Sequence, residues 1–357
     1  MKIALITDTH FGARNDSPAI AEHFGEFYRD VFFKYLDDNN INTVIHLGDI
    51  VDRRKYINYS TARHLEKTLI GPLMERDIDS HFIIGNHDTY YKNTNEINSM
   101  QELYGNSKHD KLTFYDNLPT EVDFDGTTIL LTPWICSGNF EQSMDVISNT
   151  KAQILFGHLE IKGFEMHKGA VNKDHGFDRS VFDRFDVVCS GHFHHRSTDG
   201  NISYLGSPYE ITWSDYNDPR GFHVFDTSTR SLEFIQNPLN LFYKLHYDDT
   251  NKTMEQVVNL EFDKYNDKFV KVVVSEKNNP YWFDMFIDKL EKAGPFSVQV
   301  VEDHLHMDLE SDDDIVNEAE DTMTILHKYI DAMDINTDKN RVESTIKDLY
   351  QEALSIS

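Results

Sequence analysis

Short apolar segments that each end in a polar cluster recur along the first 235 residues, and this repetition constrains the fold more than any other feature. Short apolar runs bounded by turn-forming residues are typical of buried β-strands. The segments and the clusters that follow them are residues 3–7 before Asp8-Thr9-His10, 43–47 before Gly48-Asp49, 81–84 before Gly85-Asn86-His87-Asp88, 153–156 before Gly157-His158, and 186–189 before Gly191-His192-Phe193-His194. The sequence therefore predicts strands that carry polar residues at their carboxyl ends.

Predicted helices separate the first three of these strands. Residues 18–37 and 61–74 predict two helices, and residues 128–132 and 202–205 predict further strands. A hairpin is expected from residues 222–226 and 231–235. This alternation favours a layered α/β fold, and active sites of such folds gather at the carboxyl ends of the strands.

The last third of the chain predicts a different organisation. After a first domain of residues 1–238, strands at 269–274 and 296–301 enclose a helix at 281–292, which indicates a small α+β domain over residues 239–301. Residues 302–314 form an acidic linker, and residues 315–357 carry two short amphipathic patterns. Two short helices cannot bury their apolar faces alone. They either pack onto the core of this chain or bind a partner protein, and we favour the partner.

The net charge is unusual for a protein that binds nucleic acid. It is −27, and residues 302–357 alone hold 16 Asp and Glu against 4 Lys and Arg. Proteins that track along DNA are usually basic. The charge therefore favours contact with a few phosphates through bound metal ions, or help from a basic partner.

The start of the chain and its cysteines point to the cytoplasm. Residues 1–10 predict a buried strand and not a signal peptide, and no apolar run is long enough to span a membrane. Cys136 and Cys189 each end a strand-like run, so we expect two buried free thiols.

Seven candidate metal ligands fall at the predicted strand ends. They are Asp8, His10, Asp49, Asn86, His158, His192 and His194. Asp8 and His10 stand two residues apart, so on an extended strand end they point to the same side. Oxygen and imidazole ligands without thiolate favour Mn²⁺, Fe²⁺ or Mg²⁺.

The ligands divide between two ions. We expect Asp8, His10 and His194 on one ion, Asn86, His158 and His192 on the other, and Asp49 as the bridge. Two bridged ions about 3.5–4 Å apart are typical of hydrolases that cleave phosphate esters. Activated hydroxide would then attack the phosphorus in line. His87 cannot easily bind the same ion as Asn86. We expect it to donate a proton to the leaving oxygen, held protonated by Asp88; alternatively, His87 only packs against its loop.

The order of these motifs resembles the calcineurin-like metallophosphoesterase family. Within it, the chain is similar to the SbcD-type nuclease subunits of double-strand-break repair complexes, including the small subunits of T-even phage recombination endonucleases. Supporting segments are Thr132-Pro133-Trp134, Tyr204-Leu205-Gly206-Ser207-Pro208 and Asn217-Asp218-Pro219-Arg220-Gly221-Phe222. The resemblance implies a β-sandwich flanked by helices, a capping domain and a C-terminal helical hairpin. It also implies Mn²⁺-dependent exonuclease and single-strand endonuclease activity, an SMC-like ABC ATPase partner of the SbcC kind bound through residues 315–357, and a homodimer formed through helices at 18–37 or 56–74.

Several residues near the predicted centre have two interpretations. Arg53, Arg54 and Lys55 form a tight basic cluster that either binds DNA phosphates or is a solvated helix start. Asp52 stands where relatives often carry His. His46 and His81 are expected in the core, and His195 is expected to point away from the His192 side.

Two other functions fit the same residues. One is a protein or small-molecule phosphatase on the same scaffold, and the other is an inactive scaffold that only recruits a partner. The complete ligand set together with His87 argues against the inactive scaffold.

Overall fold

The structure is a computed structural model that describes residues 1–106, 110–167, 170–172 and 175–302. The acidic linker beyond residue 302 and the predicted helices in 315–357 lie outside the described residues. No helix of the described part is long and apolar enough to cross a membrane. Cys136 and Cys189 are buried free thiols, as predicted.

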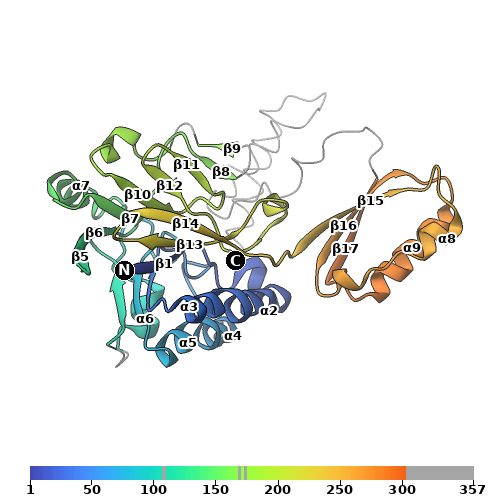
Figure 1. The fold of residues 1–357 in the computed structure, drawn as a ribbon, viewed down its shortest axis with the longest axis horizontal. Helices are drawn as coiled ribbons and strands as arrows, with labels where there is room; N and C mark the ends of the chain where they lie inside the picture. Colours follow the sequence, from blue (N-terminus) through green and yellow to red (C-terminus); the bar gives the residue numbers. More distant parts are fainter. Residues whose placement is uncertain (107–109, 168–169, 173–174, 303–357) are drawn as a thin grey trace, which may run out of the picture. The chain divides into compact units, whose positions relative to one another are not determined.

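A six-stranded sheet, the first sheet, holds the N-terminal strand near its middle (Figure 1). Its order is β14 (Ser231–Gln236), β13 (Gly221–Asp226), β1 (Lys2–Ile6), β2 (Thr43–His46), β3 (Asp79–Ile83) and β4 (Leu112–Tyr115). Strands β1 to β4 are parallel, with Leu5 opposite Ile45 and Ile45 opposite His81. This register brings the carboxyl ends of β1, β2 and β3 side by side. The predicted hairpin is β13–β14, which pairs antiparallel with β1.

A second six-stranded sheet, the second sheet, packs against the first. Its order is β11 (Ser197–Asp199), β12 (Ile202–Tyr204), β10 (Val187–Gly191), β7 (Ile154–His158), β6 (Thr127–Thr132) and β5 (Thr120–Phe124). Strands β12, β10, β7 and β6 are parallel. A short hairpin, β8 (Glu165–His167) and β9 (Ala170–Val171), follows β7.

Alternate residues of the two sheets form a shared core. Leu5 and Ile45 of the first sheet belong to one buried cluster with Leu131, Phe156 and Cys189 of the second. Side chains point to opposite faces along a strand. The intervening residues, such as Ile6 and Leu155, therefore face the helices on the outer sides.

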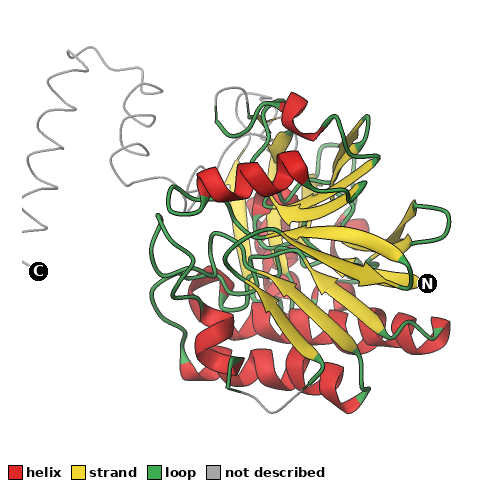
Figure 2. Cartoon of the chain, turned by 90° about the vertical axis from the view of Figure 1, so that its left-hand side faces the viewer, coloured by secondary structure: helices red, strands yellow, loops and turns green. Residues whose placement is uncertain are grey.

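Helices cover both outer faces, so the layers run helix, sheet, sheet, helix (Figure 2). Against the first sheet lie α2 (Pro18–Phe27) and α3 (Phe33–Asn39), joined by a π-helical turn over Tyr28–Phe32, and the pair α4 (Tyr59–Leu65) and α5 (Gly71–Glu75), joined by another over Glu66–Ile70. Ile147 of α7 (Phe140–Asn149) packs on the second sheet. Two short helices, α1 (Ala13–Asp16) and α6 (Ser99–Tyr104), complete this part. The layered α/β prediction is therefore confirmed.

Residues 242–302 build a separate small sheet with its own core. Strands β15 (Phe242–Asp248), β16 (Phe269–Glu276) and β17 (Ser297–Glu302) are parallel, and α8 (Met254–Val258) and α9 (Pro280–Lys292) accompany them. Val272 of β16 and Phe286 of α9 lie in a buried cluster that contains no residue of the two large sheets. The predicted helix and two of the strands are present, and β15 was not predicted. The domain boundary at 238/239 stays a prediction.

Candidate metal centre

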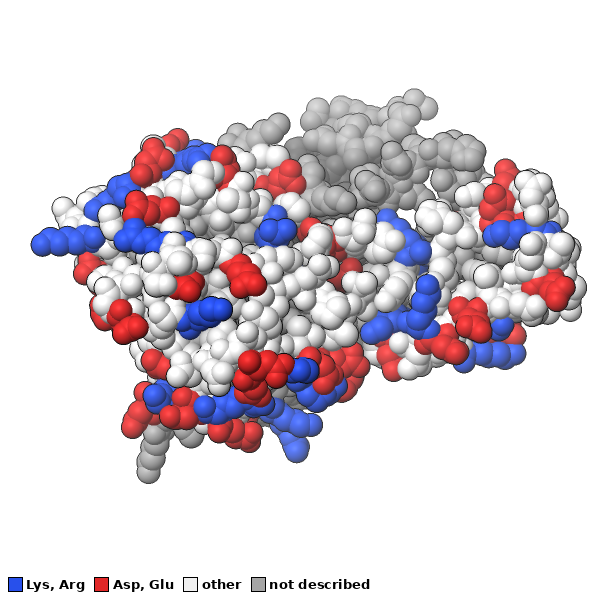
Figure 3. Space-filling view, viewed as in Figure 1, with Lys and Arg blue, Asp and Glu red and all other residues white. Residues whose placement is uncertain are grey.

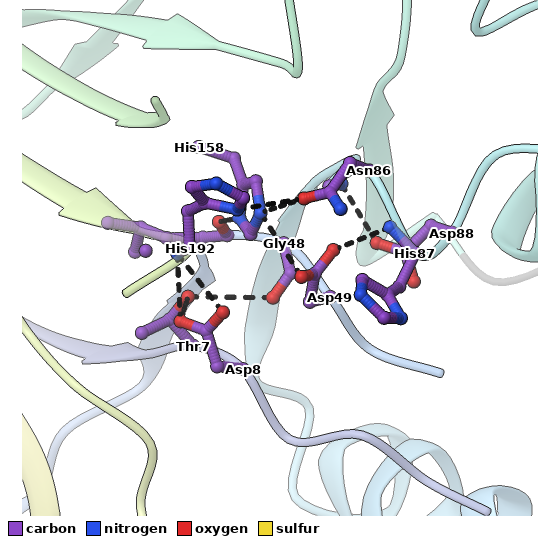
Figure 4. Close-up of polar contacts among 12 residues, drawn as sticks. Thr7, Asp8, Gly48, Asp49, Asn86, His87, Asp88, His158 and His192 are labelled. Atoms are coloured by element: carbon purple, nitrogen blue, oxygen red, sulfur yellow. Dashed lines mark hydrogen bonds and ion pairs between the residues drawn. The ribbon is translucent and has the colours of Figure 1, made fainter. Parts of the chain in front are cut away.

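The seven predicted ligands lie at the same edge of the sandwich. Figure 4 labels five of them: Asp8, Asp49, Asn86, His158 and His192. Asp8 and His10 follow β1, Asp49 follows β2, and Asn86 follows β3. His158 ends β7, and His192 and His194 follow β10. Because these strands are parallel within each sheet, their carboxyl ends meet at this edge.

The side chains form two groups joined by one carboxylate. Ligand atoms of Asp8, His10 and His194 lie within 4.8 Å of one another, and so do those of Asp49, His158 and His192. Asp49 reaches both groups, because its Oδ2 lies 3.3 Å from Nε2 of His158 and 3.9 Å from Nε2 of His10. These are the two sets that the sequence predicted, and the binding of metal ions to them stays a prediction.

Asn86 completes the second group. Its Oδ1 lies 2.9 Å from Nε2 of His158 and 3.0 Å from Nδ1 of His192. The amide oxygen of Asn86 therefore lies close enough to both ring nitrogens for the three atoms to bind the same cation.

Four of the ligands have strained backbones. The φ angle is 52° at Asp8, 42° at His10, 54° at Asp49 and 89° at His192. Residues with side chains rarely adopt positive φ, and such strain clusters at functional sites. Gly85 lies against Asp49, where a Cβ atom would collide with the carboxylate. The fold therefore brings the backbone itself close to the candidate bridge.

Burial and neighbouring charges of opposite sign shift the pKa values of the candidate ligands. Burial alone would lower the pKa of His158, but the neighbouring Asp49 outweighs it and raises this pKa to about 9. Burial would raise the pKa of Asp49, but the charge of His158 holds it well below its usual range. Burial raises the pKa of Asp8 to about 6 and lowers the pKa of His192 to about 3. A divalent cation would take the place of the proton on His158, because metal ions bind carboxylates and neutral imidazoles. The residues therefore fit a dinuclear site.

His87 is oriented differently from the prediction. Its Nδ1 lies 2.6 Å from the backbone carbonyl oxygen of Asp52, and its backbone N–H donates to Oδ1 of Asp49. The carboxylate of Asp88 instead accepts backbone N–H groups of Ile50, Val51 and Gly85. The expectation that Asp88 holds His87 protonated is therefore wrong, and burial lowers the pKa of His87.

The structure also shows residues that support the ligands. Oδ1 of Asp52 lies 3.3 Å from Nδ1 of His10, the backbone carbonyl of Leu47 lies 2.8 Å from Nδ1 of His158, and the Trp134 ring lies 5.1 Å from that of His192. Such partners fix the ring orientation of metal-binding histidines. Neither Leu47 nor Trp134 could be placed at the site from the sequence, because both contacts join different sheets or loops.

The three residues of the basic cluster have different surroundings in the structure. Nη1 of Arg53 donates to Asp16 at 2.8 Å, its Nη2 donates to Asn15, and its guanidinium lies over the ring of Tyr56. Arg54 is half-buried near Asp49 and Asp88, and its buried Nη1 has no hydrogen-bond partner among the described residues. Lys55 is exposed, and the next helix begins only at Tyr59.

Three further histidines are placed as predicted. His46 and His81 are buried in β2 and β3. His195 turns to Asp218, whose Oδ2 lies 2.9 Å from its Nδ1. His304 and His306 lie outside the described residues.

The family profile of calcineurin-like phosphoesterases matches residues 1–196, which is more than half of the chain. The chain belongs to this family of hydrolases. It is 34% identical to exonuclease subunit 1 of Enterobacteria phage T4, with 99% of each chain covered. It is 23% identical to the SbcD subunit of the SbcCD nuclease of Staphylococcus epidermidis, over 65% of this chain and 67% of that one. A dimetal phosphatase from Danio rerio shares 12% identity over 63% of this chain and 91% of that one, with a TM-score of 0.39.

Proposed function

We propose that this phosphoesterase is a Mn²⁺-dependent DNA nuclease with exonuclease and single-strand endonuclease activity. One observation supports this most: the two ligand groups that share Asp49 lie in a chain that is similar over 99% of its length to a phage exonuclease subunit. The residue types at this site are suited to hydrolysis of a phosphodiester.

The ligands would hold two Mn²⁺ ions, with Mg²⁺ or Fe²⁺ as alternatives. Asp8, His10 and His194 would hold one ion, Asn86, His158 and His192 would hold the other, and Asp49 would be shared between them. When bound, such ions would supply activation of the attacking water and neutralisation of charge on the phosphate. Asp52 and the Leu47 carbonyl keep the imidazoles of His10 and His158 in place.

His87 is the group that transfers a proton to the leaving oxygen. The carbonyl of Asp52 accepts a hydrogen bond from its Nδ1, so the neutral ring presents a bare Nε2. Because burial lowers its pKa, a proton taken up at Nε2 is readily given away. Asp88 acts through the backbone, by fixing the Gly85 turn and the Ile50–Val51 segment on which His87 and Asp49 stand.

Arg54 and Lys55 bind phosphates of the DNA on either side of the cut. Arg54 is half-buried and is not engaged by an ion pair among the described residues, whereas Arg53 is occupied with Asp16 and mainly braces the loop after β1. A guanidinium that no carboxylate holds suits a phosphate oxygen.

The protein works in the cytoplasm as a subunit of a larger enzyme. Residues 239–301 form a capping domain, residues 315–357 bind an SMC-like ABC ATPase of the SbcC kind, and two copies of this chain form a homodimer. The charge of −27 supports such a partner, because a chain with so large a negative net charge repels the DNA backbone. On the face in Figure 3, basic and acidic side chains are interspersed.

The nuclease proposal is tested with the full chain. A 3′-labelled linear duplex, a circular single strand and a phosphopeptide are each incubated with Mn²⁺, and Asp49→Ala serves as the inactive control. Release of nucleotides from the duplex and cutting of the circle are expected. Hydrolysis of the phosphopeptide without cleavage of either DNA would favour the phosphatase, and no hydrolysis at all would favour the inactive scaffold.

The partner is tested separately. The full chain and a chain that ends at residue 309 are each mixed with the ATPase, and complexes are recovered by affinity purification. The shortened chain should keep Mn²⁺-dependent hydrolysis of a small phosphodiester and lose the ATPase. Retained binding would place the contact elsewhere in the chain.

A further inference from the structure

Two neighbouring tyrosines stand exposed on the loop that follows His87. Tyr90 is 38% exposed and Tyr91 is 49% exposed. Their ring centroids lie 4.7 Å apart, with an angle of 76° between the planes. In such an edge-to-face pair, the ring that presents its edge keeps both of its faces clear of its neighbour. Because both side chains are also partly exposed, ring surface remains available to another ring.

The loop that carries them is held in place by its own contacts. Its ends pair through a bridge between Thr89 and Asn98, and the N–H of Tyr90 donates to the carbonyl of Ile97 at 2.9 Å. Nδ2 of Asn95 donates to the carbonyl of Trp134 at 2.7 Å. The tyrosines are therefore positioned before any ligand arrives, which reduces the entropy lost on binding.

The same contacts tie the loop to the metal centre. Trp134, whose carbonyl holds the loop, packs its ring 5.1 Å from that of the ligand His192. Tyr90 is three residues beyond His87, so their Cα atoms are at most about 11 Å apart. That is about three steps of a nucleic-acid strand at 3.4 Å each. A base one to three nucleotides from the cut can reach these rings.

Charge indicates how such a ligand would be held. The chain carries a net charge of −27, so its overall charge repels the DNA backbone and adds little to the affinity for DNA. Stacking of a base on an aromatic ring needs no positive charge and accepts any base. Duplex DNA hides the faces of its bases, whereas an unpaired strand exposes them.

We propose that Tyr90 and Tyr91 form a stacking site for an unpaired nucleobase next to the phosphodiester that is cut. The site makes unpaired DNA the preferred substrate. This inference rests on the proposed DNA nuclease function.

The test compares a substrate that has bases with one that does not. The full chain and the double variant Tyr90→Ala/Tyr91→Ala are assayed with Mn²⁺ on a single-stranded oligonucleotide and on bis(p-nitrophenyl) phosphate. The variant should lose about 5- to 100-fold in kcat/KM on the oligonucleotide. It should keep the wild-type rate on the small diester and the wild-type manganese content.

Matched variants separate stacking from other causes. Tyr90→Phe/Tyr91→Phe should retain activity on the oligonucleotide, and Tyr90→Leu/Tyr91→Leu should lose it, because only the first keeps flat rings. Tyr281→Ala, which removes a tyrosine that is 63% exposed on α9, is the control and should have no effect. The fold-loss should not change between low and high salt, since stacking releases no counterions.

An abasic scan locates the contact. A single abasic position within three nucleotides of the cut should slow the wild type, and the same substitution should have little further effect on the double alanine variant.

Three results of the variant assays would each overturn the stacking site. They are unchanged cleavage of the oligonucleotide by the alanine variant, equal loss on the small diester, or activity retained by the leucine variant. A change of oligomeric state in size-exclusion chromatography would assign the tyrosines to contact with a second copy. If the wild type hydrolyses the small diester but no DNA, the proposed function itself fails and the stacking site fails with it.

Discussion

The two large sheets meet at the metal centre but bring different ligands to it. The first sheet supplies Asp8, Asp49, Asn86 and His10, and the second supplies His158, His192 and His194. The first therefore contributes all of the negative charge, and the second contributes imidazoles alone. Two divalent cations held here would carry four positive charges against the two negative charges of Asp8 and Asp49, so the centre would attract an anionic phosphate.

The comparison also explains how the site is held together. Neither sheet has a complete ligand group, because each group takes residues from both. The distance between the groups is set by the core between the sheets, in which Phe156 of β7 packs edge-to-face on Phe225 of β13 at 5.1 Å. Packing in the buried core between the sheets thus determines how the ligands are arranged at the edge of the sandwich.

Removal of the shared carboxylate should have the largest effect. In Asp49→Ala both groups lose their common ligand, so manganese content should fall by two ions and DNA cleavage should fall to background. Metal analysis and nuclease assays check this. Asp145→Ala removes an exposed carboxylate on α7 and should change neither. Retention of both ions would show that the imidazoles suffice.

Loss of the proposed proton donor should separate chemistry from metal binding. His87→Ala should lower kcat by about 10²–10⁴-fold, a size typical of general acids. The manganese content should stay unchanged, because His87 belongs to neither ligand group. Cleavage at the wild-type rate would contradict the role. A fall in manganese content would instead make His87 part of the ligand shell.

A change in the shared core should weaken both sheets together. Phe156 is fully buried, and Phe156→Ala should lower the free energy of unfolding by about 3–5 kcal/mol. Chemical denaturation measures this. Phe140→Ala removes a ring that is 46% exposed on α7 and should cost less than about 1 kcal/mol. Equal losses in the two variants would show that the core between the sheets does not dominate stability.

A buried carboxylate outside the proposed ligand set gives the smallest expected effect. Glu210 accepts the backbone N–H groups of Leu241 and Phe242, and burial raises its pKa from 4.5 to about 7. The folded protein therefore holds a proton that the unfolded chain releases between these pH values. Stability should fall by on the order of 1–3 kcal/mol as the pH rises through this window.

Glu210→Gln removes that titration. Thermal unfolding followed from pH 4.5 to 7 should show a flatter pH dependence than in the wild type. An identical slope in the two proteins would mean that Glu210 stays ionised in the fold.

Several parts of the fold were predictable because their signal is local. The apolar run 3–7 and the helical spacing of Phe24 and Phe27 are set by neighbours in sequence, and the corresponding elements formed. The π-helical turns were not predictable, since an inserted residue leaves the apolar spacing almost unchanged. Strand β15 was missed although its local signal is present, because residues 243–248 alternate apolar and polar side chains after the turn residues Asn237-Pro238.

The sequence by itself determined which residues stand at strand ends, since alternating apolar runs and glycine-bounded clusters are local features. Only the tertiary structure decided how these ends combine. The pairing of Asp49 with His158, the carbonyl of Asp52 on His87, and the use of Asp88 for backbone amides all join residues from different strands or loops. Such contacts depend on how the two sheets pack. That packing results from many buried interactions between residues far apart in the chain, so no local sequence pattern predicts it.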